Sequence, residues 1–222
     1  MFEYFSNIYN LYWKHKSFLP KKQYSCFGED LFIKDFFEND NEGFYVDVGS
    51  YHPFFWNNTY LLYKKNWNGI NIDANPLSNQ LFNIARKDDY NFNLAVTNQK
   101  KNKIKLFYRR KMNVLNTTDE SFAKRNFPNG YESKDIECLS LNNILEKTRF
   151  KNKIIDFLNV DVENTEKDVL ESLNFDIYKP KLICVEIHEE NKESFKNNLT
   201  FKFLDEKGYK IVWKKEYSYI FS

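Results

Sequence analysis

The chain has 222 residues, of which 42% are hydrophobic and 18% aromatic, so general disorder is excluded and one domain with a buried core is expected. Its 33 basic and 31 acidic side chains leave a net charge of +2, and no overall field favours nucleic acid or an anionic membrane. Three cysteines stand far apart without a CxxC pair, which argues against a disulfide framework and favours a reducing, cytoplasmic setting.

Residues 1–20 are predicted to form an N-terminal helical extension that ends at Pro20. Between residues 2 and 13, aromatic and aliphatic side chains recur at steps of three and four, as on one face of a helix. We expect this face to pack on the domain or in a homodimer rather than on a membrane surface, because the opposite face is not strongly basic. No apolar run in the chain approaches the roughly 20 residues of a membrane span, and no basic region marks a signal peptide.

Residues 21–222 are predicted to form the main domain, in which apolar strands alternate with helices. The expected strands are 44–50, 69–76, 92–96, 103–109 (an edge or half-exposed strand), 156–163 and 181–187, followed by a hairpin between 208 and 221. The expected helices are 28–38, 54–66, 76–86, 139–147, 165–173 and 191–206. Segment 110–135 lacks a clear period and is expected to be irregular, as functional lids often are. This alternation predicts a doubly wound α/β fold with a mostly parallel seven-stranded sheet that ends in an antiparallel hairpin.

Two of these strands end in a carboxylate just before a turn, at Asp47 and at Asp73. The carboxyl ends of parallel strands open into the crevice where ligands bind, so both aspartates are expected at one edge of the sheet. The turn after the first strand holds only Gly49, whereas a dinucleotide fold needs three glycines to clear space for a pyrophosphate. The pattern therefore favours a ligand with ribose hydroxyls and a positive centre. Each aspartate alone could be an ordinary N-cap; the pair at this spacing favours a site.

Polar residues also follow the later strands. On the third strand Asn93 is placed where an adenine edge could be read, although it could equally cap a turn.

Four titratable side chains are expected to converge beyond the strands at 156–163 and 181–187. Asp161 and Glu163 are two residues apart, as are Glu186 and His188, so each pair shares a face if its backbone is extended. Such a group could remove a proton from an attacking hydroxyl, or it could hold a divalent metal. A buried polar network is the alternative. We assign no metal ligand from the sequence.

Several ordered motifs resemble one known family. An S-x-x-G-E-D opening is matched by residues 25–30, a D-V-G-A turn by 47–50, S-N-T by 57–59, W-x-G-I-x-I-D-A-N-P by 67–76, K-I-D-V-E-G-x-E by 159–166, and P-K-x-x-x-x-E-I-H by 180–188. This chain is similar over residues 24–221 to the FkbM-type, S-adenosylmethionine-dependent methyltransferases. It departs from them at Cys26, where many relatives carry glutamine, at Ser50 in place of alanine, and at Asn164 in place of glycine. Asparagine tolerates left-handed backbone angles better than most residues, so we expect the turn at Asn164 to survive.

The resemblance implies a Rossmann-like class I methyltransferase fold and transfer of a methyl group from S-adenosylmethionine to an oxygen of a sugar or polyketide hydroxyl. A sugar or nucleotide-sugar in surface glycan biosynthesis is the expected acceptor. The candidate cofactor-binding residues are Glu29, Asp47, Gly49, Ser50, Asn58, Thr59, Asp73, Ala74 and Asn93. The candidate catalytic residues are Asp161, Glu186 and His188, with His188 or Asp161 as the base.

Two other functions fit parts of the sequence. The run Asp161-Val162-Glu163 faintly resembles the D-x-D motif with which glycosyltransferases hold a metal and a nucleotide-sugar. A catalytically inactive module that keeps the methyltransferase fold is the second alternative, because Cys26 and Asn164 depart from the family pattern.

Overall fold

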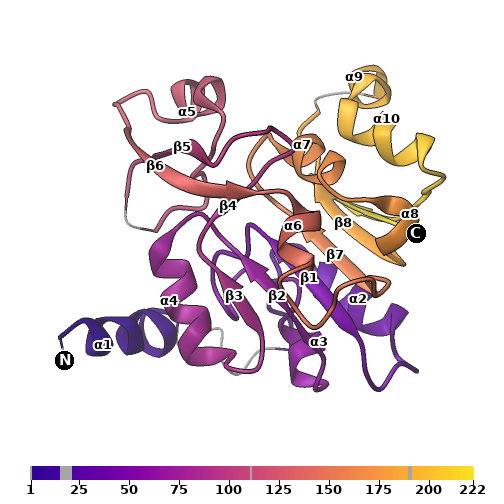
Figure 1. Ribbon diagram of the computed structural model, residues 1–222, viewed down its shortest axis with the longest axis horizontal. Coiled ribbons are helices and arrows are strands. Elements are labelled where there is room, and N and C mark those ends of the chain that lie inside the picture. The colour runs from indigo at the N-terminus through magenta and orange to yellow at the C-terminus, as the bar shows by residue number, and fades with distance from the viewer. Residues whose placement is uncertain (1, 16–21, 111, 190–191) are drawn as a thin grey trace.

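The computed structural model describes residues 2–15, 22–110, 112–189 and 192–222. In this part of the chain a seven-stranded sheet forms the centre of the domain, with helices on both faces (Figure 1). Its spatial order is β3 (Tyr90–Phe92), β2 (Asn68–Ile72), β1 (Phe44–Val48), β7 (Phe157–Val160), β8 (Leu182–Glu186), β10 (Ser218–Phe221) and β9 (Ile211–Lys215). The strands from β3 to β8 are parallel, and β10 runs antiparallel to both of its neighbours. The predicted mostly parallel sheet ending in an antiparallel hairpin is confirmed.

Side chains alternate between the two faces of the sheet because successive strand residues point in opposite directions. In β1, Val46 and Val48 join one apolar cluster, and Tyr45 joins the cluster on the other face. The first cluster includes side chains from α6 (Leu141–Leu145), α7 (Glu166–Glu171) and α10 (Leu199–Glu206). The second includes side chains from α2 (Glu29–Phe36) and α3 (Tyr60–Lys64). Asp47 therefore projects toward the face covered by α2 and α3.

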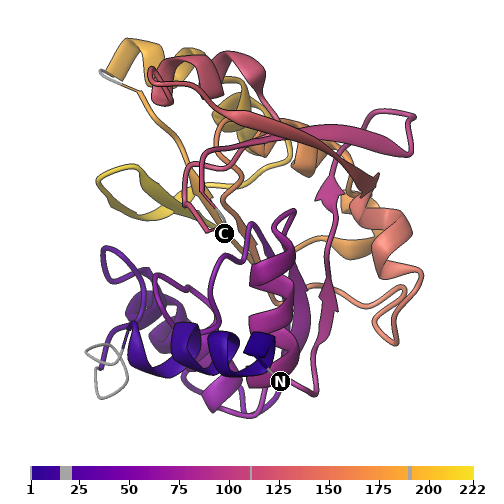
Figure 2. The ribbon, with the colours of Figure 1, turned by 90° about the vertical axis from the view of Figure 1, so that its left-hand side faces the viewer.

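A smaller sheet stands over the carboxyl edge of the large one (Figure 2). It consists of β4 (Ala95–Val96), β6 (Glu132–Leu139) and β5 (Lys103–Tyr108), with α5 (Glu120–Asn126) packed against β5. Three further helices are α4 (Pro76–Ala85), α8 (Phe175–Tyr178) and α9 (Lys192–Asn197). The hydroxyl of Thr117 donates to the backbone oxygen of Glu163 at 2.7 Å, which ties this upper layer to the turn after β7.

The N-terminal segment is helical, as predicted, and its aromatic stripe is only partly covered by the domain. α1 (Phe2–Ile8) continues into a π-helical turn, η1 (Tyr9–Trp13), beside α4 (Figures 1 and 2). Leu11 is fully buried, whereas Phe5 and Trp13 are 63% and 66% exposed. Tyr12 of this stripe stacks on Phe54 of the domain with ring centroids 5.8 Å apart, so part of the stripe contacts the domain and part is exposed. The predicted break at Pro20 lies outside the described residues.

Three predicted segments differ in the structure. The strand at 92–96 is split, because the chain leaves the large sheet after β3 and enters the small sheet as β4. The helix at 54–66 is reduced to α3, since Trp56 has a φ of +48° that ends regular structure there. Segment 110–135 is not irregular throughout, because it contains α5 and the first residues of β6.

Other boundaries shift by a few residues. The strand at 156–163 ends at Val160, and Glu163 and Asn164 have φ values of +58° and +84°. Asn164 thus takes the left-handed conformation expected of it. The helix at 191–206 is two helices, α9 and α10, of which the second is capped by Asn198. No helix in the described ranges has both the length and the apolar character needed to cross a membrane.

Candidate active site

Two adjoining cavities open at the carboxyl edge of the large sheet. They contain about 610 Å³ and about 1690 Å³ of empty space, part of it open to solvent. The residues that line both are Gly49, Tyr51, Val114 and Asp161. This shared wall lies at the ends of β1 and β7, the two neighbouring strands at the centre of the sheet.

The turn after β1 requires glycine at position 49. Gly49 has a φ of +79°, and its N–H donates to the backbone oxygen of Ile72 at 2.9 Å. A Cβ atom added there would overlap the backbone oxygen of Asp161. The absence of a side chain therefore lets the turns after β1 and β7 approach each other.

The smaller cavity has a carboxylate at one end and apolar walls. One oxygen of Asp73 accepts from the N–H of Tyr51 and the other from the N–H of Asn75, each at 2.7 Å. Apolar side chains make up much of the remaining lining: Val48, Ile72, Leu94, Ala95, Val96 and Leu106. A cavity lined in this way can accept a purine ring, and the remaining lone pairs of Asp73 suit ribose hydroxyls.

Burial raises the pKa of Asp73 to about 6. Hydroxyls that donate to this carboxylate bind its ionised form, so a ribose ligand must displace a proton below that pH. We expect the affinity for any ligand whose ribose hydroxyls bond Asp73 to fall as the pH is lowered through 6, by up to about tenfold per pH unit. Calorimetric titrations between pH 5 and 7.5 measure this slope. Asp73→Asn should abolish it, and a wild-type affinity that is constant over this range would contradict the expectation.

Asp47 lies beneath the larger cavity and is 1% exposed. One of its oxygens accepts from Asn159 at 2.9 Å, and the other accepts from Thr59 at 2.8 Å and from Asn57 at 3.2 Å. Burial raises the pKa of Asp47, and the nearby guanidinium of Arg86 opposes that rise. With its oxygens satisfied in this way, Asp47 holds the amides and hydroxyls around it in place.

Arg86 is the positive centre of the same network and is fully buried. Its guanidinium donates to the hydroxyl of Thr59 at 2.8 Å, to Asn57 at 2.7 Å and to the backbone oxygen of Pro53. It thereby shares two polar partners with Asp47 and compensates that buried charge. The network fixes the loop between β1 and α3, which forms part of the larger cavity.

Glu29 and Asn58 reach the larger cavity from other elements. One oxygen of Glu29 accepts from the hydroxyl of Ser218 at 2.6 Å, and the other accepts from the N–H of Phe27 at 2.7 Å. The amide of Asn58 donates to Asn159 at 2.9 Å. These contacts connect the start of α2, the loop before α3 and strands β7 and β10 at the wall of the larger cavity.

The lining of the larger cavity also includes four titratable side chains: Asp161, Glu163, Glu186 and His188. His188 Nε2 lies 2.9 Å from a carboxylate oxygen of Glu186, and this contact raises the pKa of His188. Burial and the charge of Glu186 raise the pKa of Glu163 to about 8. Although solvent reaches Asp161 through the cavity, the surrounding protein and Glu186 raise its pKa well above the usual range. The group therefore favours a bound proton or cation.

Nearly all candidate residues predicted from the sequence meet at these cavities. The larger cavity is lined by Glu29, Asp47, Gly49, Ser50, Asn58, Asp161, Glu186 and His188. The smaller is lined by Gly49, Asp73, Ala74 and Asp161. Thr59 and Asn93 line neither: Thr59 is fully buried under Asp47, and the amide of Asn93 donates to the backbone oxygen of Asp73 at 2.9 Å. Thr59 would therefore position Asp47, and Asn93 would position Asp73, without contact to a bound ligand.

The buried polar residues beneath the site were not predicted from the sequence. Arg86 stands at the end of a predicted helix, where arginine is ordinarily exposed. Asn71 and Asn159 are polar residues within buried apolar strands, and such interruptions indicate a hydrogen-bond partner. The register places both beside Asp47 on the neighbouring strands.

The strand order and the antiparallel β10 between β8 and β9 define a Rossmann-like methyltransferase fold, with the cavities at its ligand-binding edge. The family model described as the methyltransferase FkbM domain matches residues 47–211, which is more than half of the chain. The protein therefore belongs to the FkbM methyltransferase family. The match does not include Glu29. Comparison with curated proteins and with solved structures gives no match.

Proposed function

We propose that the protein is an S-adenosylmethionine-dependent O-methyltransferase that acts in the cytoplasm on a sugar hydroxyl in surface glycan biosynthesis. The observation that carries this proposal is the pair of joined cavities. One offers Asp73 and an apolar slot without phosphate-binding glycines, and the other gathers carboxylates and His188. Their shared wall at Gly49 and Asp161 is where a methyl donor and an acceptor would meet.

The residues present fit the proposed cofactor. Gly49 lines both cavities and has no side chain to project into them, and Asp73 can accept from both ribose hydroxyls. Ala74 and the apolar wall would hold the adenine ring, and Glu29, Ser50 and Asn58 line the larger cavity where an amino-acid moiety would extend. When bound, S-adenosylmethionine supplies an electrophilic methyl group on a sulfonium. Asp161 lies on the wall shared by both cavities, and a cation bound beside it would favour its ionised form.

The acceptor hydroxyl must lose a proton as the new bond to oxygen forms. His188 and Asp161 are the two candidate bases, because both line the larger cavity. Glu186 bonds His188 Nε2 and so orients the imidazole. Alignment of acceptor and donor would supply much of the acceleration, since fixed geometry removes the entropic cost of bringing two reactants together.

Trp56 supports a sugar as the acceptor. It lines the larger cavity, is 44% exposed, and stacks its ring on Phe55 with centroids 4.8 Å apart. An exposed indole beside carboxylates and amides matches the two surfaces of a sugar, whose C–H groups pack on an aromatic ring while its hydroxyls bond polar groups.

His188→Ala and Asp161→Asn are expected to lower methyl transfer by about 10²- to 10⁴-fold if each removes a proton-transfer group. The assay is uptake of a labelled methyl group by a panel of nucleotide-sugars, with S-adenosylhomocysteine affinity measured in parallel. Asp135→Asn, on exposed β6, is the matched control and should retain activity. A constant rate in both site variants, with cofactor affinity intact, would refute the assigned roles.

A further inference from the structure

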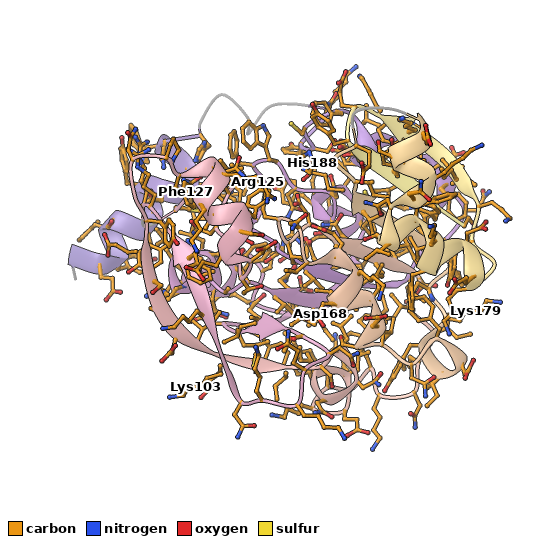
Figure 3. The ribbon with its side chains drawn as sticks, turned by 90° about the horizontal axis from the view of Figure 1, so that it is seen from above. Lys103, Arg125, Phe127, Asp168, Lys179 and His188 are labelled. Atoms are coloured by element: carbon orange, nitrogen blue, oxygen red, sulfur yellow. The ribbon has the colours of Figure 1, made fainter. Side chains whose placement is uncertain are left out.

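Three metal-ligating side chains converge at the larger cavity from the turns after β7 and β8. One ligand atom each from Glu163, Glu186 and His188 lies within 4.8 Å of the other two. The closest pair is His188 Nε2 and a Glu186 oxygen, at 2.9 Å. Figure 3 labels His188, which lies beside the cavity that Arg125 of α5 also lines.

The carboxylate of Glu163 accepts no hydrogen bond in the described part of the chain. Glu163 is 8% exposed and lines the larger cavity, and the favourable charge beside it is that of His188, which forms no ion pair with it. Two other glutamates are equally buried, and both are satisfied. Glu29 accepts from Ser218 and Phe27, and Glu166 accepts from the N–H of Asn164 at 3.1 Å. A buried carboxylate is ordinarily paired or coordinates a metal, so the missing hydrogen-bond donor to Glu163 points to a cation.

The protein supplies little positive charge of its own at this place. Five carboxylate side chains line the larger cavity: Glu29, Asp47, Asp161, Glu163 and Glu186. Arg125 is the one lysine or arginine among the described lining residues, and its guanidinium lies over the ring of Phe122. A divalent ion would offset this excess of negative charge.

We propose that Glu163, Glu186 and His188 bind a divalent cation of the Mn²⁺ type. Two carboxylates and one imidazole are oxygen and nitrogen ligands suited to such an ion. Bonds of about 2.0–2.2 Å would draw the ligand atoms closer together than in the metal-free arrangement. His188 can make that adjustment because its side chain is 47% exposed, and the open cavity provides an entry path.

An ion held by these residues would border the larger cavity, where two neighbouring hydroxyls of an acceptor could bind it. With the ion bound, His188 acts as a ligand, and Asp161 is the group left to take the proton of the acceptor. The metal site itself does not rest on the proposed methyl transfer, because the protein can be tested for it without cofactor or acceptor.

The test is titration of the full chain with Mn²⁺ after removal of bound metals with EDTA, followed by calorimetry and by loss of the electron paramagnetic resonance signal of free Mn²⁺. Wild type should bind one ion per chain. Glu163→Gln and His188→Ala should each weaken binding at least about tenfold, as loss of a ligand demands. Thermal melting of each variant tests whether it still folds.

Glu29→Gln is the matched control, because it removes one negative charge from the same cavity without touching the three ligands. Its Mn²⁺ affinity should stay within about twofold of wild type. Three results would overturn the site: no Mn²⁺ binding by wild type at millimolar concentration, wild-type affinity in Glu163→Gln, or equal weakening in Glu29→Gln. Either of the first two results would show that these residues do not bind the ion. The third would show that Mn²⁺ responds to the overall negative charge of the cavity.

Discussion

Asp73→Ala is expected to weaken binding of S-adenosylhomocysteine at least about 100-fold. The reason is the loss of two hydrogen bonds from ribose hydroxyls to a carboxylate, each worth about 1.5–3 kcal/mol. The structure adds a second consequence, because the N–H groups of Tyr51 and Asn75 lose their acceptor in this variant. Calorimetry measures the affinity, and thermal melting measures the effect on the fold.

Asp73→Asn separates these two effects. The amide keeps an acceptor oxygen and nearly the same shape, so the melting temperature should stay close to wild type while affinity still falls at least about tenfold. Asp88→Asn removes a charge from an exposed position just before β3, away from the cavities, and serves as the control. Cofactor affinity that is unchanged in both Asp73 variants would show that the end of β2 is not the ribose site.

Arg86→Met is expected to cost about 3–5 kcal/mol of folding free energy, because it leaves the buried carboxylate of Asp47 without its compensating charge. For a chain of this size that loss lowers the melting temperature on the order of 10 °C. The variant also removes a donor from Thr59 and from Asn57. Denaturant unfolding measures the change.

A double variant tests whether charge compensation is the cause. Adding Asp47→Asn to Arg86→Met removes the unpaired charge, so the double variant should be more stable than Arg86→Met alone. The exposed neighbour Lys87→Met should change stability by about 0.5 kcal/mol or less. Equal unfolding free energies for Arg86→Met and Lys87→Met would disprove the role of the network.

The large sheet could be predicted because its strands are continuous apolar runs separated by helices, and the chain direction follows from that alternation. The small sheet could not, because β6 is mostly exposed and polar and its partners lie far away in sequence. Its period-2 signal is weak, and pairing with β5 and β4 is decided by tertiary contact. α5 carried a readable signal in its N-cap, Asp119, which accepts from the N–H groups of Ser121 and Phe122.

The edge of the sheet that holds the site could also be predicted, since strand ends fix where side chains gather. The different roles of those side chains could not be predicted. Asp47 and Asp73 both follow apolar runs, yet Asp47 is 1% exposed and accepts from Asn57, Thr59 and Asn159, whereas Asp73 is partly exposed and lines the smaller cavity. The difference depends on the alternation of β1 and on the loop after it, which the sequence alone does not position.

The convergence of Glu163 with Glu186 and His188 arose for a different reason than expected. The sequence predicted an extended strand that would present Asp161 and Glu163 on one face. Instead the strand stops at Val160, and a left-handed turn brings Glu163 toward β8.

Titration of the wild-type chain with S-adenosylhomocysteine in EDTA tests whether the joined cavities bind the methyl donor. We expect saturable binding to one site per chain without any metal, and no binding of uridine diphosphate under the same conditions. Absence of heat with S-adenosylhomocysteine, together with binding of uridine diphosphate in the presence of Mn²⁺, would contradict it and favour a glycosyltransferase.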